Sequence, residues 1–171
     1  MAKTSTYLNF KSNTEAAFLF YKEVFGTEFL GPIHRMGDVP SSAGMPPLSP
    51  EEKQLVMHVA LPILGGHVLM GTDTLESMGH KLNVGNNVSI NLEPDTRSEA
   101  DRLFKELSRE GTISMPLQDM FWGAYFGAFT DSIRRKLDDQ LRDEVTVDVP
   151  RCRGSVPKER ASATSRLASW R

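Results

Sequence analysis

Two stretches of the chain combine a strand pattern with a helix pattern, and the first lies near the start. Residues 7–10 alternate apolar and polar side chains, as a half-buried strand does. Residues 12–15 read Ser-Asn-Thr-Glu, the pattern of a capping box that opens a helix. The apolar residues that follow have the helical i, i+3, i+4, i+7 spacing: Ala17, Phe20, Tyr21 and Val24. Gly26 ends this pattern, so we predict a strand and then an amphipathic helix.

The next part of the chain predicts a loop and a hairpin. Residues 31–53 contain five prolines together with glycines and serines, so we expect irregular structure through most of them. Residues 54–61 and 67–72 have strand-like composition and are separated by Pro-Ile-Leu-Gly-Gly at 62–66. We therefore predict a β-hairpin, followed by a polar connection to residue 85.

The strand and helix patterns then return. Residues 87–92 alternate, and residues 96–99 read Thr-Arg-Ser-Glu, again a capping box. The helical stripe recurs 83 positions after the first one, at Ala100, Leu103, Phe104 and Leu107. This repeat indicates an internal duplication in which each copy has the order βαβββ. Residues 112–116 and 120–129 supply two more strands, and the last strand should follow Asp131.

Composition narrows the class of protein. The 171 residues, 39% hydrophobic and 25% charged, suit one globular domain. No stretch approaches the roughly 18 consecutive apolar residues of a membrane span, and the first residues lack the apolar segment of a signal peptide. We expect a cytoplasmic protein without membrane contacts. Cys152 is the only cysteine, which excludes an intrachain disulfide and a thiolate zinc cluster.

Charge is distributed unevenly along the chain. Residues 1–131 hold 10 basic and 16 acidic residues, whereas residues 132–171 hold 10 and 6. From Pro150 onward the basic residues stand among small polar ones: Arg151, Arg153, Lys158, Arg160, Arg166 and Arg171. This composition is typical of a disordered tail. We therefore do not expect nucleic acid as a partner. Association with nucleic acid through the basic tail is a second alternative function.

Four segments together resemble a known family. They are Tyr-Leu-Asn-Phe at 7–10, Phe-Tyr-Lys-Glu-Val-Phe-Gly at 20–26, Gly-His-Val-Leu-Met-Gly-Thr-Asp at 66–73 and Gln-Asp-Met-Phe-Trp-Gly at 118–123. They are similar to the PhnB-like branch of the vicinal oxygen chelate superfamily, which includes glyoxalases, bleomycin-resistance proteins and extradiol dioxygenases. The label 3-demethylubiquinone methyltransferase, often given to this branch, finds no support here. The chain lacks the Gly-rich strand-to-helix turn of a nucleotide-cofactor site.

The resemblance covers residues from about 5 to 131, with repeat one at about 5–75 and repeat two at about 86–131. It implies an α+β fold in which paired βαβββ modules form a curved mixed sheet around a pocket. It also implies a homodimer and a small organic ligand, and it leaves open whether any reaction is catalysed.

Proteins of this superfamily generally hold a divalent metal through His and Glu at four strand positions. Carried onto this chain, three of these positions fall at Ser5 or Thr6, at Met70 and at Asn87, and the fourth falls in the last strand. A thioether and a neutral amide do not replace imidazole and carboxylate. We therefore expect no metal and no other cofactor. The alternative is a metal-dependent lyase or dioxygenase of the same fold.

Strand alternation predicts which side chains line the pocket. Leu8 and Phe10 should face the helix, so their neighbours should face the concave side of the sheet. The full predicted set of pocket residues is Tyr7, Asn9, Val68, Met70, Asn87, Ser89, Asn91, Phe121 and Trp122. Such a pocket is apolar with amide donors, which suits a small organic molecule. For the aromatic stretch at 120–129 the alternative is plain core packing.

Few other residues suggest chemistry, and we assign no catalytic residue. His58 and His67 flank the predicted hairpin and form a conceivable ligand pair, although structural roles are the more common use of such residues. His34 and His80 are expected in loops. Asp119 beside Trp122 is a candidate general base if an apolar pocket raises its pKa, and a loop carboxylate that caps a turn is the favoured interpretation.

The resemblance ends at Asp131. The family continues with a last strand of the type Phe-Gly-Val-Asn-Trp-Met, whereas residues 133–143 read Ile-Arg-Arg-Lys-Leu-Asp-Asp-Gln-Leu-Arg-Asp. One set of codons for these residues, read one base later, encodes Phe-Gly-Val-Asn-Trp-Met-Ile-Asn-Cys-Glu. We infer that residues 132–171 are a frameshifted, mostly disordered tail and that the second module lacks its last strand. The alternative is a genuine extension whose Ile133, Leu137 and Leu141 form a short amphipathic helix.

Overall fold

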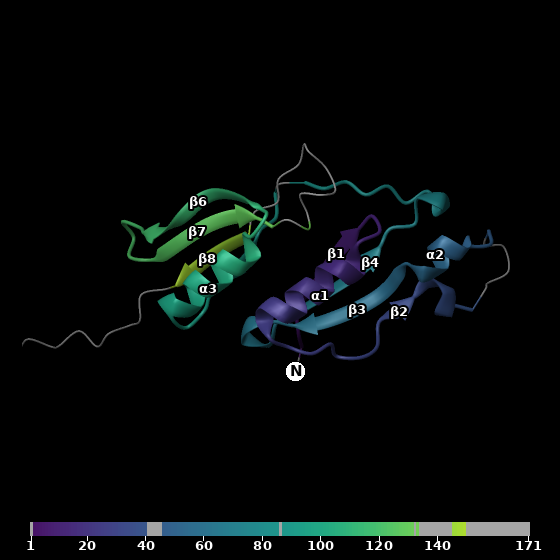
Figure 1. Ribbon diagram of the computed structural model, residues 1–171, viewed down its shortest axis with the longest axis horizontal. Coiled ribbons are helices and arrows are strands. Elements are labelled where there is room, and N and C mark those ends of the chain that lie inside the picture. Colours follow the sequence, from purple (N-terminus) through teal and green to yellow (C-terminus); the bar gives the residue numbers. More distant parts are fainter. Residues whose placement is uncertain (1, 41–45, 86, 132, 134–144, 150–171) are drawn as a thin grey trace, which may run out of the picture.

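The computed structural model describes residues 2–40, 46–85, 87–131, 133 and 145–149. They form two modules, each a four-stranded sheet with a helix packed on one face (Figure 1). The elements of the first module are β1 (Ser5–Phe10), α1 (Thr14–Phe25), β2 (His34–Arg35), α2 (Pro50–Gln54), β3 (Val56–Pro62) and β4 (Val68–Asp73). The strand order is β1-β4-β3-β2, with β1 parallel to β4 and the other pairs antiparallel.

The second module repeats this arrangement. Its elements are β5 (Ile90–Leu92), α3 (Arg97–Leu107), β6 (Thr112–Asp119), β7 (Tyr125–Thr130) and β8 (Val145–Val149). The strand order is β5-β8-β7-β6, with β5 parallel to β8. The α+β fold with two βαβββ modules is therefore confirmed.

The expectation that the second module lacks its last strand is wrong. β8 fills that position, with Leu92 of β5 opposite Val147 on one side and Gly127 of β7 opposite Val147 on the other. The sequence Val-Thr-Val-Asp-Val suits this place, because β-branched residues alternate with polar ones. Residues 134–144 and 150–171 lie outside the described residues. The frameshift, the alternative helix and the disordered tail therefore stay hypotheses.

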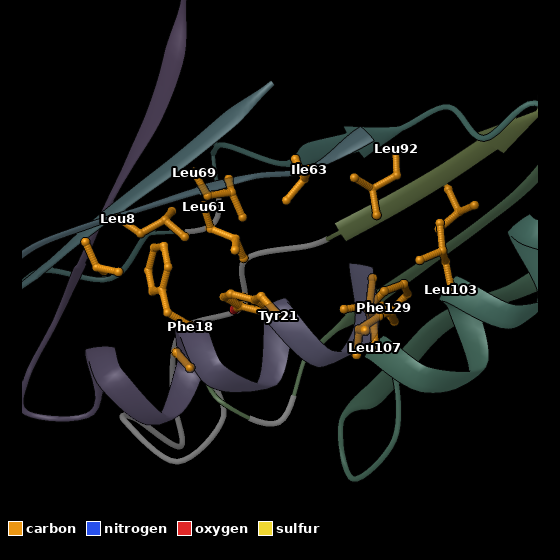
Figure 2. Packing of buried hydrophobic residues seen from close by; sticks show 14 of the residues in the cluster. Leu8, Phe18, Tyr21, Leu61, Ile63, Leu69, Leu92, Leu103, Leu107 and Phe129 are labelled. Atoms are coloured by element: carbon orange, nitrogen blue, oxygen red, sulfur yellow. The ribbon is translucent and has the colours of Figure 1, made fainter. Parts of the chain in front are cut away.

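One hydrophobic core runs through both modules (Figure 2). Phe18 and Tyr21 of α1 pack over Leu8, Leu61 and Leu69 of the first sheet. Leu103 and Leu107 of α3 pack near Leu92 and Phe129 of the second sheet, in the same cluster. These are the faces that helical spacing and strand alternation predict.

Two strand glycines allow the helices to approach the sheets. A β-carbon at Gly71 would overlap the ring of Phe18, and one at Gly127 would lie 2.7 Å from the ring of Phe104. Each module therefore seats an aromatic ring of its helix directly on a strand backbone. The ring of Phe104 also packs edge-on against Phe129, with centroids 5.1 Å apart.

The predicted capping box at residues 12–15 does not form. Helix α1 begins at Thr14, and its N-cap residue Asn13 makes no side-chain capping bond within the described residues. Instead, the buried carboxylate of Asp73 at the end of β4 accepts from the Thr14 backbone N–H (3.0 Å) and hydroxyl (2.6 Å). It also accepts from the Val56 N–H at 2.8 Å. One carboxylate thus joins a helix start to two strands. The second box forms in part, since Thr96 accepts from the Glu99 N–H at 3.2 Å.

Residues 31–40 and 46–53 contain more regular structure than expected. His34 and Arg35 form the short strand β2, so the expectation that His34 lies in a loop is wrong. Helix α2 begins after Ser49, whose hydroxyl accepts from the Glu52 N–H at 3.1 Å, with Pro50 in the first turn. No helix among the described residues is long and apolar enough to cross a membrane.

Candidate functional site

The face of the first sheet that turns away from α1 carries half-buried and exposed side chains. On β1, Leu8 and Phe10 are buried against the helix, whereas Tyr7 and Asn9 are exposed on the other face. On β4, Val68 and Met70 lie half-buried on that same open face, with Met70 directly opposite Tyr7. The predicted orientation of these side chains agrees with the structure.

Two adjoining cavities lie along β1, where the connection to the second module passes. The first has a volume of about 240 Å³ and lies between β1 and residues 82–90; Tyr7 and Asn9 are among its lining residues. The second has a volume of about 480 Å³ and lies between the β3–β4 turn and β5. The cavities share Thr6, Val88 and Ile90. Together they fall in the size range of small-molecule sites, about 300–1,000 Å³.

Polar groups with fixed partners line the larger cavity. His67 Nε2 lies 2.9 Å from the Thr6 hydroxyl. Across the cavity, Asn91 donates from Nδ2 to Glu93 at 2.8 Å, and its Oδ1 accepts from the Thr146 hydroxyl at 2.8 Å. Ser89 lies beside them in the lining. This set of imidazole, hydroxyl, amide and carboxylate groups suits hydrogen bonding to hydroxyl, carbonyl or amine groups of a small molecule.

Two carboxylates lie near one another at the β5–β8 end: Glu93 lines the cavity, and Asp148 is close to Glu93. Asp148 follows Val147 on β8, and Glu93 follows the opposing Leu92 on β5. Burial raises the pKa of Asp148, and the nearby charge of Glu93 raises it further. The Oδ1 atom of Asp148 is buried without a hydrogen-bond partner among the described residues. An anionic ligand would therefore be disfavoured at this end.

The structure gathers only part of the predicted pocket. Tyr7 and Asn9 line the first cavity, and Ser89 and Asn91 line the second. The rest of the predicted set, Val68, Met70, Asn87, Phe121 and Trp122, is absent from the described linings of these two cavities.

The aromatic stretch divides into exposed and buried residues. Phe121 and Trp122 stand at the tip of the β6–β7 hairpin, 96% and 55% exposed, where they pack on one another. Ala124, Ala128 and Phe129 of the same stretch are buried, so the core-packing alternative holds for that end.

Sequence reasoning missed several lining residues. His67 was assigned a structural role and Glu93 was not considered. Residues 82–85 form one wall of the smaller cavity, although they have no periodic pattern that predicts a position. Strand alternation at 87–92 was the signal that located Ser89 and Asn91.

At three of the family's four metal positions the side chains do not fit a metal. Thr6 offers a hydroxyl, Met70 a thioether and Asn87 an amide. Asn9 lies opposite Thr72 and Asn91 opposite Thr146, so the counterpart of Met70 is residue 144, outside the described residues. Within the described ranges no three His, Cys, Asp or Glu side chains gather as metal ligands.

The other candidate residues are not brought together as proposed. His58 lies on β3 and His67 just before β4, at opposite ends of that antiparallel ribbon, so they are no ligand pair. Asp119 is 69% exposed and forms an ion pair with Arg97 of α3. The idea of a general base in an apolar pocket is therefore wrong for Asp119.

Comparison with known proteins gives consistent matches. The sequence model of the Glyoxalase/Bleomycin resistance protein/Dioxygenase superfamily matches residues 7–132. Protein YjdN of Escherichia coli (strain K12) is 30% identical over 132 residues, which cover 74% of this chain and 86% of YjdN.

Solved structures agree with these matches. Protein PA1353 from Pseudomonas aeruginosa superposes with a TM-score of 0.68 at 29% identity, over 88% of this chain and 98% of its own. A putative 3-demethylubiquinone-9 3-methyltransferase, PhnB protein, from Bacillus cereus superposes with a TM-score of 0.62 at 23% identity, over 86% and 99%. At that identity the second likeness concerns the fold alone.

Proposed function

Because the chain belongs to the Glyoxalase/Bleomycin resistance protein/Dioxygenase superfamily, we propose that it binds a small organic molecule in the two cavities along β1. The observation that carries this proposal is the continuity of the cavities. They share three lining residues and combine apolar walls with oriented polar groups on both modules. Apolar walls with a few placed polar groups are the usual composition of a small-molecule site.

The polar lining sets the chemistry of the proposed ligand. Glu93 contributes negative charge, and Asp148 beside it is held in a site that disfavours further charge. The ligand is therefore a neutral or amine-bearing molecule with hydroxyl or carbonyl groups. The side-chain amide of Asn91 has a fixed orientation, because its nitrogen donates to Glu93 and its oxygen accepts from Thr146. Asn91 is therefore the polar group best placed to contact a ligand.

The proposal also covers the oligomeric state and the location of the protein, which do not depend on the two cavities. A homodimer is proposed because the resemblance implies one and because Phe121 and Trp122 expose apolar rings that a second copy would cover. Light scattering at micromolar concentration should give the mass of two chains, and the mass of one chain would contradict the dimer. The cytoplasm is proposed as its location, since a lone cysteine suits a reducing compartment.

The binding proposal is tested by ligand screening with matched variants. Thermal shift against hydroxylated and carbonyl-bearing compounds identifies ligands, and calorimetry then measures their affinity. Asn91→Ala and Tyr7→Phe should each weaken binding, because a lost hydrogen bond is worth about 1 kcal/mol. Leu19→Ala is the control, since Leu19 is exposed on α1 and lies outside the described linings of both cavities. Phe121→Ala tests the hairpin tip as an alternative site. Affinity that falls in Phe121→Ala and not in Asn91→Ala would place the site at the hairpin and overturn the proposal.

A further inference from the structure

Two histidines are register partners on the ribbon of β2 and β3, and neither lines the cavities described above. His34 of β2 is the register partner of His58 of β3 in an antiparallel pair. The register shifts at the next pair, Arg35 with Val56, so that Met57 is the extra residue on β3. Directly opposed residues on antiparallel strands have β-carbons about 4.5–5.5 Å apart and project to the same face. The next residue, Arg35, turns toward α1, where it forms an ion pair with Glu15 at 2.9 Å. His34 therefore lies on the opposite, open face, together with His58.

A tyrosine supports one of these imidazoles. The Tyr7 hydroxyl lies 3.4 Å from Nδ1 of His58, and the two rings have centroids 6.1 Å apart. When the Tyr7 oxygen accepts the Nδ1 proton, the lone pair of His58 falls on Nε2. A hydrogen bond at the other ring nitrogen is the usual way in which metal-binding histidines are oriented.

We propose that His34 and His58 together bind one divalent late transition-metal ion, Cu²⁺ or Zn²⁺, with Tyr7 positioning His58. Imidazole is a preferred ligand of these ions, whereas Mg²⁺ and Ca²⁺ require oxygen ligands. Water completes the coordination, because no third His, Cys, Asp or Glu joins the pair in the described part of the chain. His34 is exposed and His58 half-buried, so water and a metal ion can reach both side chains.

This site is distinct from the family's metal positions. Those positions fall on β1, β4 and the segment leading into β5, whereas His34 and His58 lie on β2 and β3. Neither histidine is among the described lining residues of the two proposed ligand cavities. Tyr7 belongs to both proposals, because it lines the first cavity and contacts His58. The histidine variants separate them, since they alter the metal site and leave the lining of both cavities intact.

The test uses untagged full-length protein titrated with CuCl₂ and ZnCl₂ by calorimetry, with electron paramagnetic resonance of the Cu²⁺ form. Wild type should show one saturable site and a spectrum with two nitrogen ligands. His34→Asn and His58→Asn should each weaken binding, and their combination should leave only background binding. Tyr7→Phe should weaken it about tenfold, as removal of a hydrogen-bond partner of a metal ligand does.

Matched controls separate this site from other sources of binding. His67→Asn removes a histidine outside the pair and should leave affinity unchanged. His34→Asn alters an exposed side chain, so its unfolding temperature without metal should equal that of wild type. A wild type with no saturable site, a spectrum with a single nitrogen ligand, or unchanged affinity in the double variant would each overturn the proposal.

Discussion

The two modules share one topology but differ in the hydrogen bonds that satisfy the start of the helix and fix it to the last strand. In the first module, Asp73 at the end of β4 accepts three hydrogen bonds and ties β4 to the start of α1 and to β3. Asp73 lies opposite Phe10, and the residue opposite the matching Leu92 in the second module is Val147. Helix α3 is capped locally by Thr96 instead.

This difference shows that one duplicated fold can satisfy a helix start in two ways. A buried carboxylate from a distant strand satisfies the backbone donors of the first helix and fixes tertiary structure at the same time. A local cap satisfies the second helix, and among the described residues no carboxylate links β8 to the start of α3. The anchored module should therefore lose more stability when its polar contact is removed, and four sets of substitutions measure how far the contrast extends.

Truncation of the core should have the largest effect. Leu103 of α3 is fully buried, so Leu103→Ala should lower the free energy of unfolding by about 2–5 kcal/mol. Leu61→Ala in the first module has the same burial and serves as its counterpart. Urea unfolding measures both. A change below about 0.5 kcal/mol for Leu103→Ala would mean that this residue does not pack as described.

Removal of the buried carboxylate comes next. Asp73→Ala leaves the backbone N–H groups of Thr14 and Val56 without their acceptor. A buried donor left unsatisfied costs about 1–3 kcal/mol, so we expect a loss of about 2–3 kcal/mol in urea unfolding. Because Asp73 has no counterpart at Val147, Val147→Ala should cost only its lost apolar contacts, about 1–2 kcal/mol. Equal losses would remove the contrast between the modules.

Substitutions at the helix N-caps should change the free energy of unfolding less. Thr96→Ala should lower the free energy of unfolding by about 1 kcal/mol, because it removes the acceptor for the Glu99 N–H. Ser12→Ala tests the sequence-predicted box that the structure lacks, and it should change stability by less than about 0.5 kcal/mol. A loss at Ser12 as large as that at Thr96 would show that the first box does form.

Asp148 on β8 should give the smallest effect, with the opposite sign. Its pKa is raised by burial and by Glu93, so the folded state binds the proton more tightly than the unfolded state does. This contribution to stability is present below the unfolded pKa of about 3.9 and is lost as the pH rises through the folded pKa. Asp148→Asn should therefore be more stable than wild type at pH 7, with the difference vanishing near pH 4. Urea unfolding at both pH values measures it, and a destabilised Asn variant at pH 7 would contradict it.

Periodic signals in the sequence predicted most of the fold. The stripes from Ala17 and from Ala100 gave both helices, because a helix buries one face of fixed spacing. Strand β8 was not predicted, because the last-strand sequence typical of the family does not follow Asp131, although residues 145–149 alternate apolar and polar side chains. Ser49 and Glu52 form a capping box at the start of α2, the same motif that predicts the other two helices. The prolines around it favoured irregular structure, so this helix was not predicted.

The candidate site was less predictable. Strand alternation decides the face on which a side chain lies, and it placed Tyr7, Asn9 and Asn91 correctly on their strands. A cavity also needs walls from other segments, and the wall at residues 82–85 depends on how a non-periodic connection crosses β1. Phe121 and Trp122 were placed in the pocket, yet a hairpin tip extends beyond its sheet, which leaves both rings largely in solvent.

The continuous core also determines how the chain can be divided. Tyr21 of α1 donates a hydrogen bond to Asp131 beyond β7 at 2.8 Å, and Arg102 of α3 donates to the Val24 carbonyl of α1 at 2.8 Å. A cut in the connection between the modules would expose to water the apolar surface that α1 and α3 now cover for one another. The duplicated halves have thus become mutually dependent. Expressed separately, each half should aggregate, and the intact chain should unfold in a single cooperative transition.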